Sequence, residues 1–321
     1  RGYPPHALNL LPGQKMLNSR DRLTTPVPAS GHARTDDGML IHWRSIGSGP
    51  PLVLCNGVGV STFFWKYLAN KLMDRHQVIL WDYRGHGRSD RRVDPQTGDV
   101  SVRRHARDLL AVLDAAGVEE PAVLIGHSMG CQVALETWVL APERVAGMVL
   151  ALGSAGRTLH TFGGYAGSAR IFRGVHRVIQ AAGPRVNQLT RIVLGSPLAW
   201  EFARRLALVD PYYTLREDLT PYLQHLSSMD MRLFLRCVLE VDIHDAWPAL
   251  PNIQVPVLVI AAERDAFTPI SCSREIADTL PDADLFILAD GSHAALIEQP
   301  ETFNHRIKRF LSEKFPSPPA A

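Results

Sequence analysis

Cysteine is scarce in this sequence: the 321 residues include only four, at Cys55, Cys131, Cys237 and Cys272. They lie far apart and form no Cys-x-x-Cys pair or His/Cys cluster, which argues against a disulfide framework and against a zinc site. Cys55 and Cys131 fall in apolar stretches, where cysteine usually packs as a small hydrophobic side chain. Free thiols of this kind are typical of a reducing compartment, so we expect a cytoplasmic protein.

Long hydrophobic runs and an excess of one charge are missing as well. No apolar segment is long enough to span a membrane, and the N-terminus, which begins at Arg1, lacks the pattern of a signal peptide. The 34 basic residues nearly balance the 32 acidic ones and are scattered along the chain. Nucleic acid is therefore not expected as a partner. We expect no metal and no cofactor, and the sequence leaves the oligomeric state open.

The sequence does contain a regular alternation of short apolar runs and amphipathic stretches. Runs such as "PPLVLCNG", "PAVLIGHS" and "VPVLVIAA" predict strands that are covered on both faces. The stretches between them have helical spacing, as in "VRRHARDLLAVLDAAGV". Strands that alternate with helices predict an α/β fold, with a mostly parallel central sheet and helices on both faces.

The rhythm of strands and helices also predicts where the chain divides. Residues 1–30 are rich in Pro, Asn and Ser and predict an extended N-terminal arm. Residues 31–154 and 251–321 carry the strand and helix alternation and predict one α/β core. Residues 155–250 show helical patterns and no convincing buried strand. We interpret this segment as a helical insertion that forms a cap.

The stretch "GHSMG" places Ser128 between Gly126 and Gly130, where a predicted buried strand turns directly into a helix. So sharp a turn forces the serine into a strained backbone conformation, and a Cβ at either flanking position would collide with the neighbouring strand or helix. The serine hydroxyl is then lifted above the carboxyl edge of the sheet, at a helix N-terminus that favours developing negative charge. Ser128 is therefore the candidate nucleophile.

A serine hydroxyl needs a base to take its proton and an acid to orient that base. With the nucleophile on a middle strand, both partners are expected later in the chain, the acid first, in loops after strands. His293 and Asp265 meet this condition. Asp290 and Glu263 are the rival acids, and Asp290 would bridge poorly to the imidazole because it ends the same strand.

Four other histidines are possible alternatives to His293. His127 adjoins the serine, but the turn directs its side chain elsewhere, so we interpret it as structural. His86, His105 and His305 lie in a loop or on helices away from strand ends. We expect these three to be solvated or locally hydrogen-bonded.

Acyl transfer also needs N–H donors aimed at the oxyanion of the tetrahedral intermediate. The backbone amide of Met129, directly after the serine, is one candidate. The loop "CNGVGV" supplies the other, with Val58 as the expected donor, and Gly57 and Gly59 allow that loop to approach closely. A merely tight turn is the alternative interpretation of this loop. We expect Asn56, Gly57 and Met129 to contact the substrate.

With these motifs in place, the sequence resembles the α/β-hydrolase fold family, in particular its cap-bearing esterases, lipases and carbon–carbon-bond hydrolases. The matching stretches are "NGVG", "DYRGHGRSD", "GHSMG", "ERDAFTP" and "GSHAALIEQPETF". The resemblance implies a triad of Ser128, Asp265 and His293 and a helical cap over residues 155–250. Many relatives have His-Gly where this chain has Asn56-Gly57. Serine rather than aspartate at the turn argues against haloalkane dehalogenases and epoxide hydrolases.

A fold match does not settle function, so several hypotheses stay open. The first is a cofactor-free serine hydrolase that cleaves a carboxylic ester of a hydrophobic acyl or aromatic substrate. A second keeps the triad for carbon–carbon cleavage, lactone opening, or acyl or peracid transfer. A third is a ligand receptor on the same fold. Aromatic residues of the cap are expected mostly in its own core, with a few facing the serine: Phe162, Tyr165, Phe172, Trp200, Phe202, Tyr212, Tyr213, Tyr222, Phe234 and Trp247.

Overall fold

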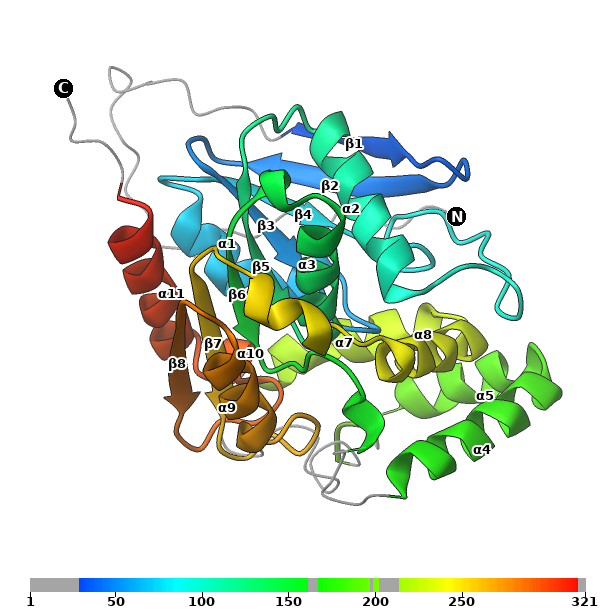
Figure 1. Ribbon diagram of the computed structural model, residues 1–321. Helices are drawn as coiled ribbons and strands as arrows, with labels where there is room; N and C mark the ends of the chain where they lie inside the picture. The colour runs from blue at the N-terminus through cyan, green and yellow to red at the C-terminus, as the bar shows by residue number, and fades with distance from the viewer. Residues whose placement is uncertain (1–28, 161–166, 197–198, 202–213, 317–321) are drawn as a thin grey trace.

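A twisted sheet of eight strands lies at the centre of the protein, seen in a computed structural model that describes residues 29–160, 167–196, 199–201 and 214–316 (Figure 1). The strand order is β1-β2-β4-β3-β5-β6-β7-β8. β2 pairs antiparallel with β1 and β4, and all other neighbours are parallel. The strands are β1 (Ala29–Arg34), β2 (Leu40–Ile46), β3 (Pro51–Cys55), β4 (Gln77–Trp81), β5 (Ala122–His127), β6 (Val145–Ala151), β7 (Val257–Ala262) and β8 (Ala283–Leu288). The predicted α/β fold class is confirmed.

The first strand corrects the boundary expected for the N-terminal arm. β1 begins at Ala29 and pairs with β2 through its whole length, so the last two residues assigned to the arm are already in the sheet. Residues 1–28 lie outside the described residues. The turn between the two strands contains Gly38 with a φ of 82°, a left-handed conformation that glycine adopts without steric cost.

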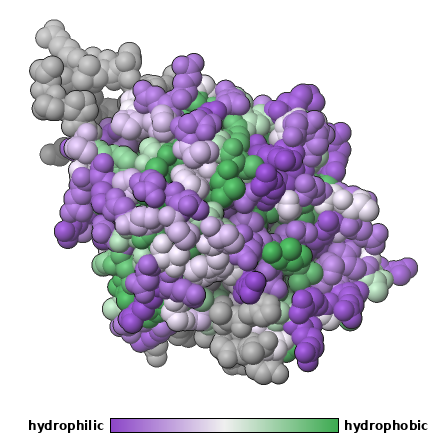
Figure 2. Space-filling model, in the orientation of Figure 1, coloured by the Kyte–Doolittle hydropathy of each residue, from purple (hydrophilic) through white to green (hydrophobic). Residues whose placement is uncertain are grey.

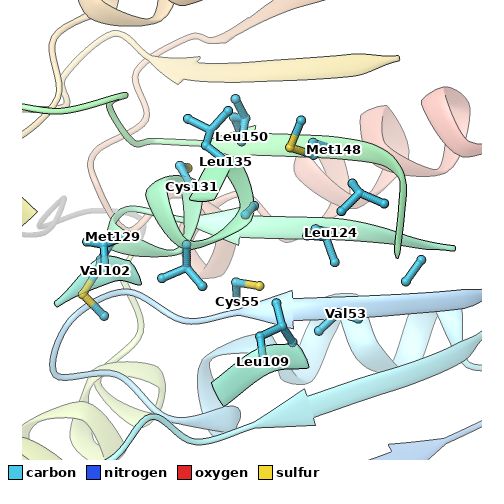
Figure 3. Close-up of a cluster of buried hydrophobic side chains, with 14 of the residues drawn as sticks. Val53, Cys55, Val102, Leu109, Leu124, Met129, Cys131, Leu135, Met148 and Leu150 are labelled. Atoms are coloured by element: carbon cyan, nitrogen blue, oxygen red, sulfur yellow. The ribbon is translucent and has the colours of Figure 1, made fainter. Parts of the chain in front are cut away.

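Helices cover both faces of the sheet. α1 (Lys66–Leu72), α10 (Ala295–Glu298) and α11 (Pro300–Lys314) pack on one face. α2 (Val102–Ala115), α3 (Met129–Leu140) and α9 (Ile270–Thr279) pack on the other. Figure 3 shows how apolar side chains of β3, β5 and β6 meet those of α2 and α3. This two-sided burial holds the strand ends, and the loops that follow them, in fixed positions.

The regular elements that the structure describes between β6 and β7 are all helices. They are η3 (Thr158–His160), α4 (Ser168–Ala182), α5 (Arg185–Leu194), α7 (Arg216–Ser228), α8 (Met231–Ile243) and η5 (Trp247–Asn252). Within the described parts of residues 155–250 the only β pairing is a single bridge between Gly156 and Asp245. α4 packs on α8, and α5 packs on α7 and α8. α4 and α5 lie on the outside of the molecule, farthest from the sheet (Figure 1).

Candidate active site

Ser128 occupies a strained turn between β5 and α3, with φ 55° and ψ −119°. The flanking glycines make this turn possible. A Cβ on Gly126 would lie 2.4 Å from the Gly130 carbonyl oxygen in the first turn of α3. A Cβ on Gly130 would lie 2.1 Å from the carbonyl oxygen of Cys55 at the end of β3. Both contacts are with backbone atoms that cannot move aside, so each position requires glycine.

The three residues predicted to form a triad, Ser128, Asp265 and His293, are joined by hydrogen bonds across the carboxyl edge of the sheet. His293 Nε2 lies 3.0 Å from Ser128 Oγ, and His293 Nδ1 lies 2.8 Å from Asp265 Oδ2. Ser128 follows β5, Asp265 follows β7 and His293 follows β8. Parallel strands end at the same edge, which is why residues 165 apart in sequence can meet.

Asp265 is held as a fully buried carboxylate. Oδ1 accepts hydrogen bonds from the backbone N–H groups of Phe267 and Thr268, and the Thr268 hydroxyl donates to Oδ2. Burial alone would raise the pKa of Asp265. The adjacent His293 and the hydrogen bonds from Thr268 outweigh burial and lower it. Asp265 therefore stays ionised and can orient the imidazole and stabilise its protonated form.

The rival acids lie outside this arrangement. Asp290 is exposed and forms an ion pair with Arg264. Glu263 is also exposed and accepts a hydrogen bond from the backbone N–H of Asp290. The geometry brings neither carboxylate to His293.

His127 contacts the loop that carries His293. Its Nε2 donates a hydrogen bond of 2.9 Å to the His293 carbonyl oxygen, and its ring lies 5.0 Å from the His293 ring. The side chain is buried, and burial together with the nearby His293 lowers the pKa of His127 to about 3. A neutral, buried imidazole in this position fits the structural role expected for His127.

The loop after β3 lies directly against Ser128. A Cβ on Gly57 would be 3.0 Å from His127 Nδ1 and 3.3 Å from the Ser128 Cβ. Within the described part of the chain, neither the backbone N–H of Val58 nor that of Met129 has an acceptor in the protein. Two unsatisfied N–H groups beside a serine are what an oxyanion site requires.

The side chains of Met129 and Asn56 are not placed as expected for substrate contacts. Met129 is buried in the core, near Val102 in Figure 3. Asn56 is fully buried, with Nδ2 donating to the Trp81 carbonyl and Oδ1 accepting from Trp65 Nε1. We therefore correct both expectations, because both side chains are buried and the Asn56 carbonyl oxygen accepts a hydrogen bond from Tyr83. The Asn56 side chain instead fixes the start of the loop.

Two histidines form hydrogen bonds with the backbone of Gly59, in the loop after β3. The Gly59 N–H donates to His86 Nε2 over 3.1 Å, and the Gly59 carbonyl accepts from His225 Nδ1 over 2.9 Å. His225 belongs to α7, and its Nε2 accepts from the Gly87 N–H. Burial, and then the neighbouring His225, lower the pKa of His86 to about 4. Burial also lowers the pKa of His225. Both rings are therefore neutral near pH 7, which their roles as acceptors require.

The three histidines expected to be solvated or locally hydrogen-bonded differ in outcome. His86 is locally hydrogen-bonded, through Nδ1 to the Arg84 carbonyl oxygen, but it is fully buried. His105 is also fully buried rather than solvated, and its ring packs against Tyr83 inside the core. In the described residues neither nitrogen of His105 has a hydrogen-bond partner, and burial holds its pKa well below the ordinary value. His305 is exposed, as expected. His225 is not predicted from the sequence, because nothing in its local pattern separates it from an ordinary helix residue.

Glu298 was also missed, and it organises the loop that presents His293. Its carboxylate accepts hydrogen bonds from the N–H and the hydroxyl of Ser292, the residue before His293. It also accepts from the Thr214 hydroxyl of the inserted segment. The only local signal is an acid five residues after the histidine, at the end of a four-residue helix.

The inserted segment reaches the loop of Val58 through apolar side chains as well. A Cβ on Gly59 would lie 2.7 Å from the Phe234 ring and 3.3 Å from the Leu226 side chain. Phe234 and Leu226 therefore lie on top of this loop. Phe162, Tyr165, Phe202, Tyr212 and Tyr213, which the sequence analysis assigned to the cap, lie outside the described residues.

Among the described residues no group of three or more His, Cys, Asp or Glu side chains could hold a metal ion. No helix in the described ranges is both long enough and apolar enough to cross a membrane.

Comparison with known proteins agrees with this architecture. A family model described as "Alpha/beta hydrolase family" matches residues 52–306. A protein of Azorhizobium caulinodans named "Putative carbamate hydrolase RutD" is 31% identical over 273 residues, which cover 85% of this chain and 95% of that protein. A hydrolase structure from Pseudomonas aeruginosa PA01 is 26% identical, with a TM-score of 0.70, and covers 88% of this chain and 98% of its own.

A more distant structure, a thermophilic esterase from Thermogutta terrifontis, is 22% identical with a TM-score of 0.68 and covers 90% of this chain and 99% of its own. At that identity the likeness concerns the fold alone. The family match spans most of the chain and confirms the resemblance drawn from the motifs. The chain belongs to the alpha/beta hydrolase family and is a hydrolase.

Proposed function

We propose that the protein is a serine hydrolase that cleaves a carboxylic ester of a hydrophobic acyl or aromatic substrate through an acyl-enzyme on Ser128. The observation that carries this proposal is the continuous chain of hydrogen bonds from Ser128 Oγ through His293 to Asp265. Nucleophilic acyl transfer requires at least an activated serine and an oriented imidazole that acts as its base.

In the proposed reaction, Ser128 Oγ attacks the ester carbonyl while His293 Nε2 takes the hydroxyl proton. The carbonyl oxygen becomes an oxyanion that accepts hydrogen bonds from the backbone N–H groups of Val58 and Met129. His293 then gives its proton to the departing alcohol, and the C–O bond breaks. A water molecule, deprotonated by His293, attacks the acyl-enzyme, and collapse of the second intermediate releases the acid and restores Ser128. Asp265 stays ionised throughout and stabilises the imidazolium.

We also propose that residues 155–250 act as a cap that selects the substrate. Support comes from Phe234 and Leu226, which lie on the loop of Val58 beside the serine. Hydrophobic side chains above the reacting carbonyl favour apolar acyl or aromatic groups over charged ones.

A carbamate is the second candidate substrate, and the identity of 31% with the Azorhizobium caulinodans protein named as a carbamate hydrolase favours it. The same attack of Ser128 on the carbonyl carbon applies, but nitrogen donation makes a carbamate carbonyl less electrophilic than that of an ester. An unsubstituted carbamate is also smaller and more polar than the acyl esters that the apolar cap residues favour.

The test is labelling with a fluorophosphonate, followed by turnover of a panel of nitrophenyl esters and carbamates. We expect covalent labelling at Ser128 and the highest kcat/KM for an apolar ester. Higher kcat/KM for carbamates would replace the ester assignment and leave the mechanism intact. Absence of labelling and turnover would contradict the mechanism and favour the ligand-receptor hypothesis.

A further inference from the structure

The outer surface of α4 and α5 combines exposed apolar residues with an unusual excess of arginine. Ten large hydrophobic residues are exposed in the described parts of the chain, and six of them lie on these two helices. They are Ile171, Val175, Val178, Leu189, Ile192 and Val193, with exposed fractions between 44% and 71%. Concentrations of exposed apolar side chains on a protein surface commonly mark an interaction site.

The spacing of these residues gathers them into one stripe on each helix. Ile171, Val175 and Val178 follow one another at intervals of four and three, which places them on one face of α4. Leu189, Ile192 and Val193 share one face of α5 in the same way. The inner faces of the two helices pack on α8 and α7. The stripes are therefore a second apolar face that is not needed to hold the helices in place.

The charge of this segment is entirely positive. Between Glu143 and Glu201 the sequence contains seven arginines and no acidic residue or lysine, although the whole chain has a net charge of only +2. Arg144 and Arg157 pair with Asp114 and Asp245. The other five are exposed on α4 and α5: Arg170, Arg173, Arg177, Arg185 and Arg191. None of these five has an ion-pair partner among the residues that the structure describes.

We propose that the α4–α5 surface docks the protein on an anionic lipid bilayer. The apolar stripes would enter the interface between headgroups and acyl chains, and the arginines beside them would contact lipid phosphates. Helices that lie on the outside of the molecule can meet a flat surface without rearrangement (Figure 1). In Figure 2 the lower right, where these helices lie, is mostly hydrophilic, in keeping with the arginines exposed beside the apolar stripes.

Charge decides between a bilayer and a second copy of the chain. A symmetric dimer through this surface would place the five arginines of one copy against the same five of the other, and like charges oppose each other at such an interface. An anionic bilayer supplies the opposite charge and an apolar layer together. The proposal does not depend on the proposed ester chemistry, because docking uses no residue of the candidate active site.

The test uses the full chain carrying Ser128→Ala, so that no lipid can be hydrolysed during the measurement. Binding is measured by flotation with vesicles of phosphatidylcholine alone and of phosphatidylcholine mixed equally with phosphatidylglycerol. We expect binding to the mixed vesicles only, and weaker binding as salt is raised, because ions screen the arginines.

Two variants and two matched controls locate the contact. Arg173→Gln with Arg177→Gln should weaken binding about 25-fold, at about fivefold for each arginine. Ile192→Ser should weaken it about tenfold, because one apolar side chain no longer enters the interface. The controls are Arg75→Gln with Arg107→Gln, which are exposed elsewhere, and Leu285→Ser on β8. Both controls should bind as the parent does.

Three outcomes would overturn the proposal. The first is no binding to the mixed vesicles at low salt. The second is binding that the controls weaken as much as the α4–α5 variants do. The third is self-association without lipid, seen by analytical ultracentrifugation, that Ile192→Ser abolishes, since the surface would then serve a second copy. Circular dichroism of each variant checks that the helices are retained.

Discussion

His225 Nδ1 donates a hydrogen bond of 2.9 Å to the carbonyl oxygen of Gly59, across 166 residues of sequence. The bond ties a helix of the inserted segment to the loop that carries the Val58 N–H. The same ring accepts from the Gly87 N–H, and Gly59 also donates to His86. Both polar groups of the Gly59 backbone are therefore satisfied by side chains, and the orientation of the preceding amide is restricted.

This arrangement predicts that His225→Phe lowers kcat about tenfold or more with little change in KM. The loop would keep its contacts with β3 but lose the restraint on the Val58 N–H, which matters mainly in the transition state. His225→Asn should retain more activity, because its amide can still donate toward Gly59. The control is Gln224→Ala, an exposed neighbour on α7. Steady-state kinetics beside thermal unfolding separate positioning from global destabilisation, and equal effects on kcat of His225→Phe and Gln224→Ala would refute this prediction.

The hydrogen-bonded set of Ser128, His293 and Asp265 predicts strongly non-additive losses. Ser128→Ala should reduce kcat on the order of 10⁴-fold or more, and adding His293→Ala to it should cost little further, because residues that act as one unit lose their effect together. The measurement is kcat for the single and double variants on one ester. If the two losses multiply instead, the residues have separate roles and the proposed mechanism fails.

Several features of the site follow from local sequence, and others do not. The glycines around Ser128 and the order of acid and histidine are local or ordinal signals, so the serine turn and the residues that meet it were predicted. The partners of Gly59 are His225 of the inserted segment and His86 of the loop after β4, at separations where no periodicity connects them. Glu298 is only six residues from Ser292, but an acid at that spacing has no distinctive pattern. The burial of His86 and Asn56 is likewise not predictable locally, because each depends on a ring from another element, His225 for His86 and Trp65 for Asn56.

Glycine at position 130 should be intolerant of a single added carbon. In Gly130→Ala the new Cβ would meet the Cys55 carbonyl oxygen, and the backbones of β3 and α3 would have to separate. We expect a loss of about 1–3 kcal/mol or more in the free energy of unfolding. Gly174→Ala is the control, because nothing lies within 4 Å of its Cβ position in the middle of α4. That change should stabilise the protein by about 0.5–1 kcal/mol. Urea unfolding measures both, and effects of the same sign would contradict the assignment.

His127 predicts part of the dependence of stability on pH. Its pKa is about 3 in the folded protein, because of burial and the neighbouring His293, against about 6.5 for an ordinary histidine. Between these values the unfolded chain binds a proton that the folded one does not, so stability falls as the pH falls, by up to about 1.4 kcal/mol per pH unit.

His127→Gln should remove this contribution and flatten the curve of unfolding free energy against pH between about pH 4 and 6. The exposed His305, changed to Gln, is the control and should leave the slope unchanged. Urea unfolding at several pH values provides the slopes, which are compared rather than the absolute stabilities. The same slope in the His127 variant as in the parent would show that this histidine is not kept neutral by burial.

Phe234 predicts how the inserted segment selects the acyl chain. Its ring lies on Gly59, beside the loop that would hold the oxyanion, so its removal should open space above the reacting carbonyl. Each methylene buried in that space contributes roughly 0.8 kcal/mol, or about fourfold in kcat/KM, until the pocket is full. Phe234→Ala should therefore move the optimum of kcat/KM toward longer acyl chains across a series of nitrophenyl esters.

Phe315→Ala is the control, because that ring packs on Gly147 near the start of β6, at the opposite edge of the sheet. It should change stability but not the shape of the chain-length profile. If the profiles of Phe234→Ala and the parent coincide, the segment over the serine does not choose the substrate, and the cap role proposed for residues 155–250 is wrong even if the mechanism at Ser128 holds.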